Sequence, residues 1–371
     1  MQPIAIVAFD GVFPGAEDAA ALWPLIRSGS QRMGPPPPGR WSRDPADLVD
    51  PAGGPDRIFH EQACFIADTP PLPADLDLPP EQLQGLDPIV ALVLRAGAGA
   101  WRRVRRDQID PRRCGVILGN IALPTAAAGQ LAAQLLLPAL GLPPPERTSD
   151  PRKRYVAGLP GILLARALGL GGGARTIDAA CAAGLYSVAL GMQELRAGRL
   201  DCVLAGGASR PDSLYTQMGF TALGALSRGG VCRPFDAEAD GLIVGEGAGV
   251  LVLKRLQDAI DQGDRIHAVL QGYGLSNDQR GSLFSPDSDG QLRALTAAYR
   301  SCGWQPWDVQ HIECHGTGTP VGDATELRSL RRLWQEAPAG SSAVLGSVKS
   351  NIGHLLTGAG AAGLIKALLA L

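Results

Sequence analysis

The chain has 371 residues, a formal net charge of −2 at pH 7, 5% aromatic residues and seven cysteines. This composition provides neither the basic face nor the base-stacking side chains of a nucleic-acid-binding protein, so nucleic acid is not an expected partner. The cysteines follow no paired spacing, and the N-terminus opens directly into a strand pattern rather than a signal peptide. We therefore expect a reduced, cytoplasmic protein.

Short apolar runs bounded by glycine alternate with helical patterns along the chain. The predicted strands are residues 4–9, 115–118, 202–205, 249–253, 267–272, 309–313 and 343–347, and the predicted helices are residues 87–104, 182–195, 288–300 and 325–335. This order is typical of an α/β layered fold with buried strands. No linker divides the chain. The best candidate for an internal boundary, or seam, between two halves is a polar helix at 254–265. We expect a single large domain or two fused halves.

One cysteine stands between an extended segment that ends at Ala180 and a helical pattern that begins at Ala182. Cys181 would therefore lie on a sharp strand-to-helix turn, where unpaired N–H groups and the helix dipole would stabilise a thiolate. Small neighbours leave room for a substrate chain, and the same amides can donate to an oxyanion. The alternative interpretation of this turn is a small buried core residue, the usual situation of a cysteine.

Two histidine motifs follow predicted strands. His315 stands on a glycine-rich loop after the strand 309–313, and ValLysSerAsnIleGlyHis repeats the arrangement with Lys349 and His354. Open α/β sheets place reactive groups at the carboxyl ends of strands. Each histidine alone is more often structural than catalytic. A strand-end cysteine together with two imidazole donors, however, suits acyl-thioester chemistry.

The polar residues near His315 have structural interpretations. Asp323 and Glu326 have the spacing of a helix-capping box ahead of the helix 325–335, so we assign them to structure and not to catalysis. A metal site of His311, Glu313 and His315 on one strand face is conceivable. It would leave the cysteine and the second histidine motif without a role, so we expect no metal site.

Three motifs resemble those of one family. AspAlaAlaCysAlaAlaGly, HisGlyThrGlyThrProValGlyAsp and LysSerAsnIleGlyHis occur in the order found in the β-ketoacyl synthases, and residues 13–16 and 233–241 extend the likeness over essentially the whole chain. The sequences LeuAspPro at 86–88 and LeuGlyAsnIleAlaLeuPro at 118–124 are most similar to ketosynthases of iterative type I polyketide and polyunsaturated fatty acid synthases. The resemblance implies an α/β, thiolase-like layered αβαβα fold of two related halves. Residues 1–258 would carry the nucleophilic cysteine, and residues 259–371 both histidines.

The resemblance also implies a mechanism. Cys181 would take an acyl group from a carrier-protein thioester, a malonyl-type extender would lose carbon dioxide, and its carbanion would attack the acyl-cysteine to give a β-ketoacyl thioester. His315 and His354 would donate N–H groups to the thioester carbonyl of the extender, where enolate charge develops. Lys349 would hold this arrangement electrostatically.

Partners follow from the same resemblance. Thr317 and Thr319 match the positions that bind the phosphopantetheine arm of the substrate carrier, so acyl carrier protein is the expected partner. The chain itself would bind no cofactor. The family forms homodimers through the segment that leads to the cysteine, here residues 174–180, and acyltransferase or reductase domains of a longer synthase are further expected partners.

Two other interpretations remain open. A ketosynthase-like partner that shapes product length or only decarboxylates extenders typically lacks the cysteine, whereas this chain has Cys181. A degradative thiolase would usually show a second catalytic cysteine near its C-terminus, and no such motif precedes Leu371. The condensing enzyme is therefore the leading interpretation.

The last apolar segment, residues 355–371, is too short and glycine-rich for a membrane span, so we expect a buried helix. Ketosynthases continue past this helix into further strands and a GlyPheGlyGly-type turn whose N–H joins the oxyanion hole. We therefore expect a C-terminally truncated chain, with an incomplete C-terminal half and little condensing activity by itself.

Overall fold

The computed structural model describes residues 2–41, 43–66, 71–73, 76–146, 150–155, 157–210, 213–279 and 286–371. Its main sheet has the strand order β3-β2-β4-β5-β1-β6. The strands are β1 (Ile4–Val12), β2 (Cys114–Gly119), β3 (Ala174–Ile177), β4 (Cys202–Ser209), β5 (Gly247–Arg255) and β6 (Ala268–Leu270). A second sheet pairs β7 (His311–Glu313) in parallel with β8 (Val344–Gly346).

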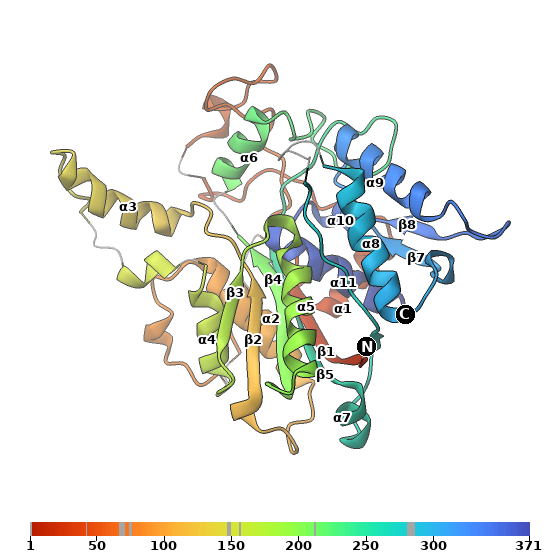
Figure 1. Cartoon of the computed structure of the whole chain (residues 1–371). Coiled ribbons are helices and arrows are strands. Elements are labelled where there is room, and N and C mark those ends of the chain that lie inside the picture. Colours follow the sequence, from red (N-terminus) through yellow and green to blue (C-terminus); the bar gives the residue numbers. More distant parts are fainter. Residues whose placement is uncertain are drawn as a thin grey trace.

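Helices cover both faces of the main sheet (Figure 1). They are α1 (Ala19–Arg27), α2 (Pro88–Arg102), α3 (Ala126–Ala139), α4 (Leu159–Ala167), α5 (Ala183–Arg196), α6 (Ser213–Ala222), α7 (Leu256–Asp261), α8 (Ser288–Cys302), α9 (Pro320–Leu333), α10 (Lys349–Ile352) and α11 (Ala359–Ala370). Among the described residues, none of these helices is long and apolar enough to cross a membrane.

The strands form because alternate apolar side chains enter two separate cores. In β4, Leu204 packs into the core shared with α2 and α4, whereas its neighbours Val203 and Ala205 pack into the core shared with α5 and α11. Every residue of β2 and β4 is buried. A strand covered on both faces reads as a continuous apolar run, which is why the sequence revealed these strands.

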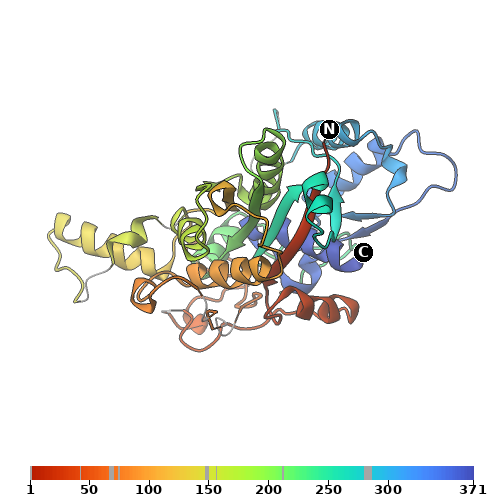
Figure 2. The same cartoon turned by 90° about the horizontal axis from the view of Figure 1, so that it is seen from below.

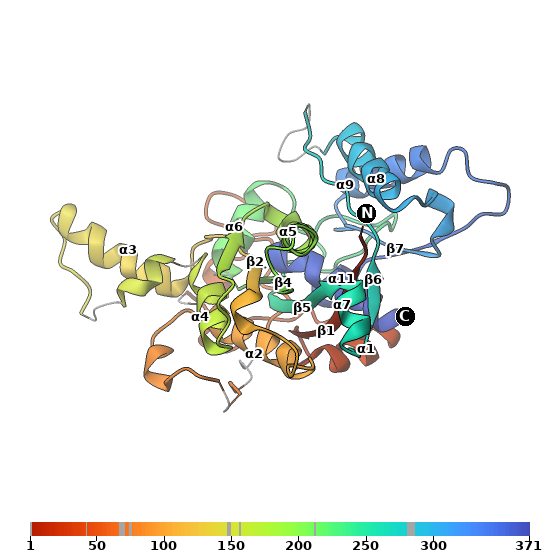
Figure 3. The ribbon, with the colours of Figure 1, turned by 60° about the horizontal axis from the view of Figure 1, so that its bottom comes forward.

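Helices α5 and α11 form the layer between the two sheets. Helix α11 contacts β4 and β5 of the main sheet and β7 of the second sheet, while α5 contacts β2 and β4. Helices α8 and α9 pack against each other beside β7 and β8 (Figure 3). The order of layers is therefore α2 and α4, main sheet, α5 and α11, second sheet, α8 and α9. This is the αβαβα layering expected from the sequence.

Each predicted strand and helix is present, with shifted ends. The segment expected to be extended as far as Ala180 is a strand only to Ile177. Helix α9 begins at Pro320 instead of residue 325, because proline is favoured in the first helical turn and Thr319 is the N-cap. The polar seam helix is α7, and the C-terminal segment is the largely buried α11, as predicted. Strand β6, which follows the seam, pairs with β1 of the main sheet.

One helix stands away from the layers. Figures 1 and 2 show α3 projecting from the body of the molecule beside the β3 edge. Two of its leucines and the leucine that follows it are exposed: Leu135 by 65%, Leu136 by 59% and the adjoining Leu140 by 71%. These exposed fractions are unusual for large apolar side chains that follow one another on a single helix.

Candidate active site

Cys181 lies in the tight turn predicted for it. Strand β3 ends at Ile177, a 3₁₀ turn covers Ala180–Ala182, and α5 begins at Ala183. Ala180 has a φ of 48°, a left-handed conformation that a residue with a side chain adopts only under constraint. The Asp178 carboxylate helps to hold it by accepting the Ala180 N–H at 3.0 Å.

His354 directly contacts the thiol. Its Nε2 lies 3.1 Å from the Cys181 Sγ, and the residue is only 1% exposed. The Leu356 N–H donates to Nδ1 at 3.1 Å, so Nδ1 has no proton and the neutral ring carries its proton on Nε2. Burial, with Lys349 and His315 as smaller causes, lowers the pKa of His354 well below its usual range. His354 therefore faces the sulfur as a neutral N–H donor.

His315 joins this pair from the loop after β7. Its ring meets the His354 ring edge-on, with the centroids 5.4 Å apart. The residue is exposed to solvent, yet its ring packs against His354, and desolvation there, with the Lys349 cation as second cause, lowers its pKa to about 3. His315 is therefore also neutral at pH 7.

Lys349 connects the histidine loop to α10. Its Nζ donates to the His315 carbonyl oxygen at 2.6 Å, and the residue is 4% exposed. Its charge favours the Cys181 thiolate, but burial has the larger effect and raises the pKa of Cys181 above its ordinary value. A backbone hydrogen bond in the turn also lowers the pKa of Cys181, in the direction expected from the sequence, but desolvation outweighs this effect and that of the lysine.

Asp323 and Glu326 have a structural role, but they do not form the capping box expected from their spacing, because Thr319 is the N-cap of α9. They lie inside the helix and bind N–H groups of the histidine loop. Glu326 accepts from His315 N at 2.7 Å and Gly316 N at 2.8 Å. Asp323 accepts from Thr317 N at 3.1 Å, from Gly318 N at 3.2 Å and from Phe235 N at 2.7 Å. The sequence did contain a signal for this role. The glycine-rich loop lies outside helices and strands, so its backbone N–H groups need acceptors from side chains.

Glu313 holds the neighbouring segment. Its Oε1 accepts from the Val348 N–H at 2.6 Å, next to Lys349, and its Oε2 accepts from Lys366 Nζ of α11 at 2.6 Å. His311 Nε2 is 3.6 Å from the same carboxylate. The part of the chain that the structure describes contains no group of three His, Cys, Asp or Glu residues able to hold a metal ion.

The two threonines of the loop lie together. Their hydroxyl oxygens, Thr317 Oγ1 and Thr319 Oγ1, are 2.9 Å apart. The Thr317 carbonyl accepts from the Cys232 thiol at 3.4 Å, so the backbone of this residue is held from two directions. The structure thus brings all six sequence-predicted site residues into one region: Cys181, His315, Thr317, Thr319, Lys349 and His354.

An apolar cavity of about 250 Å³ opens at the Cys181 side chain. Helix α6, the segment around Ile121 and Leu123, and Leu356 line it, whereas neither histidine does. The sequence analysis missed these lining residues, because nothing local distinguishes them from ordinary core side chains. The thiol therefore stands between a polar group of imidazoles and an apolar cavity.

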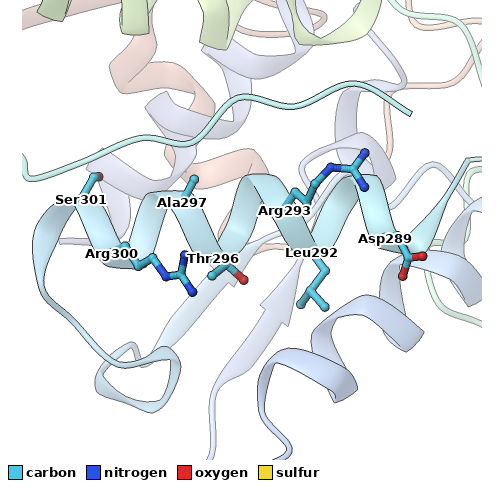
Figure 4. A pocket seen from close by; sticks show the side chains of 7 residues that line it. All are labelled: Asp289, Leu292, Arg293, Thr296, Ala297, Arg300 and Ser301. Carbon is cyan, nitrogen blue, oxygen red and sulfur yellow. The ribbon is translucent and has the colours of Figure 1, made fainter. Parts of the chain in front are cut away.

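A larger hollow of about 770 Å³ lies along α8. Figure 4 shows that its side chains, from Asp289 to Ser301, all come from this one helix. Asp289 pairs with Arg332, and Arg293 donates to the Asn277 carbonyl at 2.6 Å. This surface contains none of the candidate residues. The smaller cavity at Cys181 is therefore the one that belongs to the candidate active site.

Comparisons with known proteins agree with this geometry. Residues 1–259 match the family described as "Beta-ketoacyl synthase, N-terminal domain", and residues 267–371 match "Beta-ketoacyl synthase, C-terminal domain". One phenolphthiocerol/phthiocerol polyketide synthase polypeptide of Mycobacterium tuberculosis is 33% identical over 100% of this chain and 20% of its own length. Another polypeptide of that synthase, from the same organism, is 35% identical over 99% of this chain and 25% of its own length. The chain thus spans about a fifth to a quarter of these relatives.

Solved structures show the same fold. The "PfaC Keto synthase-Chain length factor" structure superposes with a TM-score of 0.91 at 35% identity, over 100% of this chain and 42% of that one. The ketosynthase from module 6 of the bacillaene synthase of Bacillus subtilis 168 gives a TM-score of 0.83 at 29% identity, over 99% of this chain and 61% of that one. These neighbours confirm the thiolase-like α/β fold, and the family matches over almost the whole chain show that it belongs to the β-ketoacyl synthases, as a ketosynthase domain of the polyketide synthase kind.

Proposed function

We propose that this chain catalyses a decarboxylative Claisen condensation between an acyl group on Cys181 and a malonyl-type extender on acyl carrier protein. The observation that carries the proposal is the contact of the His354 Nε2 with the Cys181 Sγ at 3.1 Å, with the His315 ring beside it. These three side chains come from segments far apart in the sequence. Their convergence at the Cys181 sulfur supports a nucleophile served by two hydrogen-bond donors.

In the first step, Cys181 attacks the thioester carbonyl of the acyl carrier. A carbon–sulfur bond to Sγ forms, the carrier sulfur leaves, and the thiol proton is transferred to that sulfur. Because the His354 Nε2 already carries a proton, His354 is suited to donate a hydrogen bond rather than to act as the base. The nearby Lys349 cation favours the thiolate as it forms.

In the second step, the extender loses carbon dioxide and leaves an enolate. The N–H groups of His315 and His354 stabilise the enolate oxygen, and both rings are neutral donors at pH 7. The enolate carbon attacks the acyl carbonyl on Cys181. A carbon–carbon bond forms, the Cys181 thiolate leaves, and it regains a proton from water. The product is a β-ketoacyl thioester.

The partners belong to the same proposal. Thr317 and Thr319 would bind the phosphopantetheine arm of the carrier, and the chain itself would bind no cofactor. Other synthase domains, such as acyltransferase and reductase domains, would act on the same carrier. The division into halves at 258 and 259, the truncation of the chain and its cytoplasmic location stay predictions.

A homodimer is also proposed. Strand β3 pairs only with β2 among the described strands, so one edge of the main sheet is open there. Helix α3 projects on the same side of the molecule as that edge (Figure 1), and burying its exposed leucines against a second copy would stabilise the assembly. Light scattering at micromolar concentration tests this proposal, and a monomer contradicts it.

Intact-mass measurement after incubation with acyl carrier tests the condensation. The wild-type chain should gain one acyl group, and Cys181→Ala should gain none. His315→Ala and His354→Ala should still load the acyl group while β-ketoacyl product falls by roughly 10²- to 10³-fold, because each change removes one donor to the enolate oxygen. Acylation of Cys181→Ala would remove the cysteine from its role. Decarboxylation without condensation in the wild type would favour a decarboxylase partner instead.

A further inference from the structure

Two cysteines outside the active site face each other across the main sheet. Cys114 is the first residue of β2 and Cys202 is the first residue of β4, and the register of these parallel strands places the two residues directly opposite each other. Both are free thiols, and both pack into the core shared with α2 and α4, so they lie on the same face of the sheet. Neither has a part in the proposed condensation.

The starts of the two strands are held in register just before the cysteines. The Asp201 N–H donates to the Arg113 carbonyl oxygen at 2.9 Å, and the Arg113 guanidinium donates to the Asp201 carboxylate at 3.0 Å. Neighbouring strands lie about 4.8 Å apart, which is within the range of about 4.4–6.8 Å that separates the Cα atoms of a disulfide. A bond between the two sulfurs therefore requires only a small movement of the strand starts.

Hydrogen bonds give the two thiols different roles. The Cys114 thiol donates to the Asp110 carbonyl oxygen at 3.3 Å, so the hydrogen bond between the two thiols uses the proton of Cys202. This bond lowers the pKa of Cys114 despite the opposing effect of burial, and the Lys254 cation adds to it. The same bond, together with burial, raises the pKa of Cys202. Cys114 is therefore the sulfur that ionises first, and the thiolate is the reactive form of a cysteine.

Hydrogen peroxide is an oxidant that such a pair can use. The Cys114 thiolate attacks one peroxide oxygen, the O–O bond breaks, and a sulfenic acid forms while the released hydroxide takes up the proton that Cys114 gave up. The Cys202 sulfur then attacks the Cys114 sulfur, the S–O bond breaks, and the hydroxyl leaves as water with the Cys202 proton. Two thiols are oxidised to one disulfide, and one peroxide is reduced to two waters.

The disulfide would be strained and therefore easy to reduce. The Cβ atoms of opposite residues are about as far apart as the strands, whereas a disulfide holds them about 3.8 Å apart, so the bond pulls the strand starts together. Strained disulfides are the labile ones. Both side chains are 0% exposed, so reagents reach them through local opening of the strand starts, beside the exposed residues 105–108.

We propose that Cys114 and Cys202 form a reversible oxidation site, which hydrogen peroxide converts to a disulfide and reduced glutathione restores to two thiols. In the reduction, two glutathione thiols give up their hydrogen atoms and become glutathione disulfide. The site is separate from Cys181, which follows the carboxyl end of β3, whereas the two cysteines stand at the amino ends of strands parallel to it. The disulfide also protects Cys114 from further oxidation to an irreversible sulfinic acid.

Peptide mapping of the whole chain under non-reducing conditions tests the proposal. Trypsin cleavage after arginine and lysine releases residues 114–147 and 200–228, each with one cysteine. After incubation with hydrogen peroxide and blocking of the remaining thiols with iodoacetamide, the two peptides should be recovered as one species joined by a disulfide. Reduced glutathione, added before the blocking step, should return both to free peptides.

Two variants test the roles assigned to the sulfurs. Cys202→Ala should lose the joined species and accumulate Cys114 as a sulfinic acid, because no second thiol captures the sulfenic acid. Cys114→Ala should leave Cys202 as a thiol. The matched control is Cys314→Ala, which removes another buried thiol, 6% exposed, just after β7 of the second sheet and should keep the joined species.

Three results on the wild-type chain would overturn the proposal. One is a disulfide between Cys64 and Cys232, the neighbouring thiols of another core cluster, without the bond between Cys114 and Cys202. Another is oxidation confined to Cys181. The third is a disulfide between Cys114 and Cys202 that glutathione does not reduce.

Discussion

The two sides of the site are held by different forces. The segment with Cys181 sits against β2 and β4, whose residues are all buried, so close packing fixes it. The histidine loop follows β7 of the two-stranded sheet, where Val344 of β8 is 67% exposed, and carboxylates hold it through backbone hydrogen bonds. Packing depends on volume, whereas the carboxylate contacts depend on charge and on acceptor geometry. Substitutions of each kind should therefore affect one side more than the other.

Replacement of Glu326 should give the largest effect on the histidine side. In Glu326→Gln, an amide N–H can face the His315 and Gly316 N–H groups that the carboxylate now accepts. A displaced His315 should lower the rate of β-ketoacyl formation by roughly 10²-fold while acyl loading on Cys181 is retained. Product analysis and intact mass measure the two rates separately.

Glu336→Gln is the control for this experiment. It makes the same substitution, and removes the same carboxylate charge, at an exposed residue outside the histidine loop. Equal losses of loading and condensation in Glu326→Gln would show that the two sides are not held independently.

Gly207 on β4 tests the packed side. A Cβ at this position would come within 2.2 Å of the Thr357 carbonyl oxygen and 3.2 Å of the Gly184 Cα. Gly207→Ala should therefore separate β4 from the segment that carries His354 and lower the free energy of unfolding by about 1–3 kcal/mol. Thermal unfolding measures this change, and acyl loading and condensation should fall together.

Gly161→Ala on α4 is the matched control, because its Cβ would have only ordinary contacts, the nearest at 3.8 Å. It should be neutral or slightly stabilising, since alanine favours a helix more than glycine does. A Gly207→Ala protein as stable as Gly161→Ala would contradict the close-packing account.

Lowering the pH should give the smallest of the expected effects, a loss of folding stability without a matching loss of decarboxylation rate. The folded-state pKa values of His315 and His354 lie below the unfolded value of about 6.5, so below that pH the unfolded chain binds more protons than the folded one. Stability is therefore lost as the pH falls from about 6.5 towards the folded pKa values. The decarboxylation rate should show no loss centred near pH 6.5, because the folded rings remain neutral there.

Cys181 provides the contrasting titration. Burial raises its pKa, so alkylation by iodoacetamide should accelerate only as the pH rises beyond the ordinary thiol range. A decarboxylation profile that falls at pH 6.5, or an alkylation profile centred below pH 8, would reverse the assigned protonation states.

The sequence predicted the parts of the site that depend on local pattern. The extended run, the small residues and the helix period around Cys181 specify its turn, and the strand before each histidine motif specifies the edge on which it lies. The function of Asp323 was not visible, because its spacing to Glu326 matches a common helix cap while one of its donors, Phe235, lies far away in the sequence. The pKa of Cys181 depends on burial by the whole fold, which no local motif reports. The cavity residues were missed for the same reason.

The place of α11 in the middle layer has a consequence for biosynthesis. Strand β1 starts at Ile4, yet α11, one of the helices that contact it, spans Ala359–Ala370. On a ribosome that adds about 5–20 residues per second, the part of the α11 face of the main sheet that α5 does not cover stays open for on the order of ten seconds after β5 has been made. During that time apolar side chains such as Leu251 and Leu253 of β5 lack part of their final packing. Contacts so distant in sequence also slow folding itself. The nascent chain should therefore depend on chaperones until α11 has emerged.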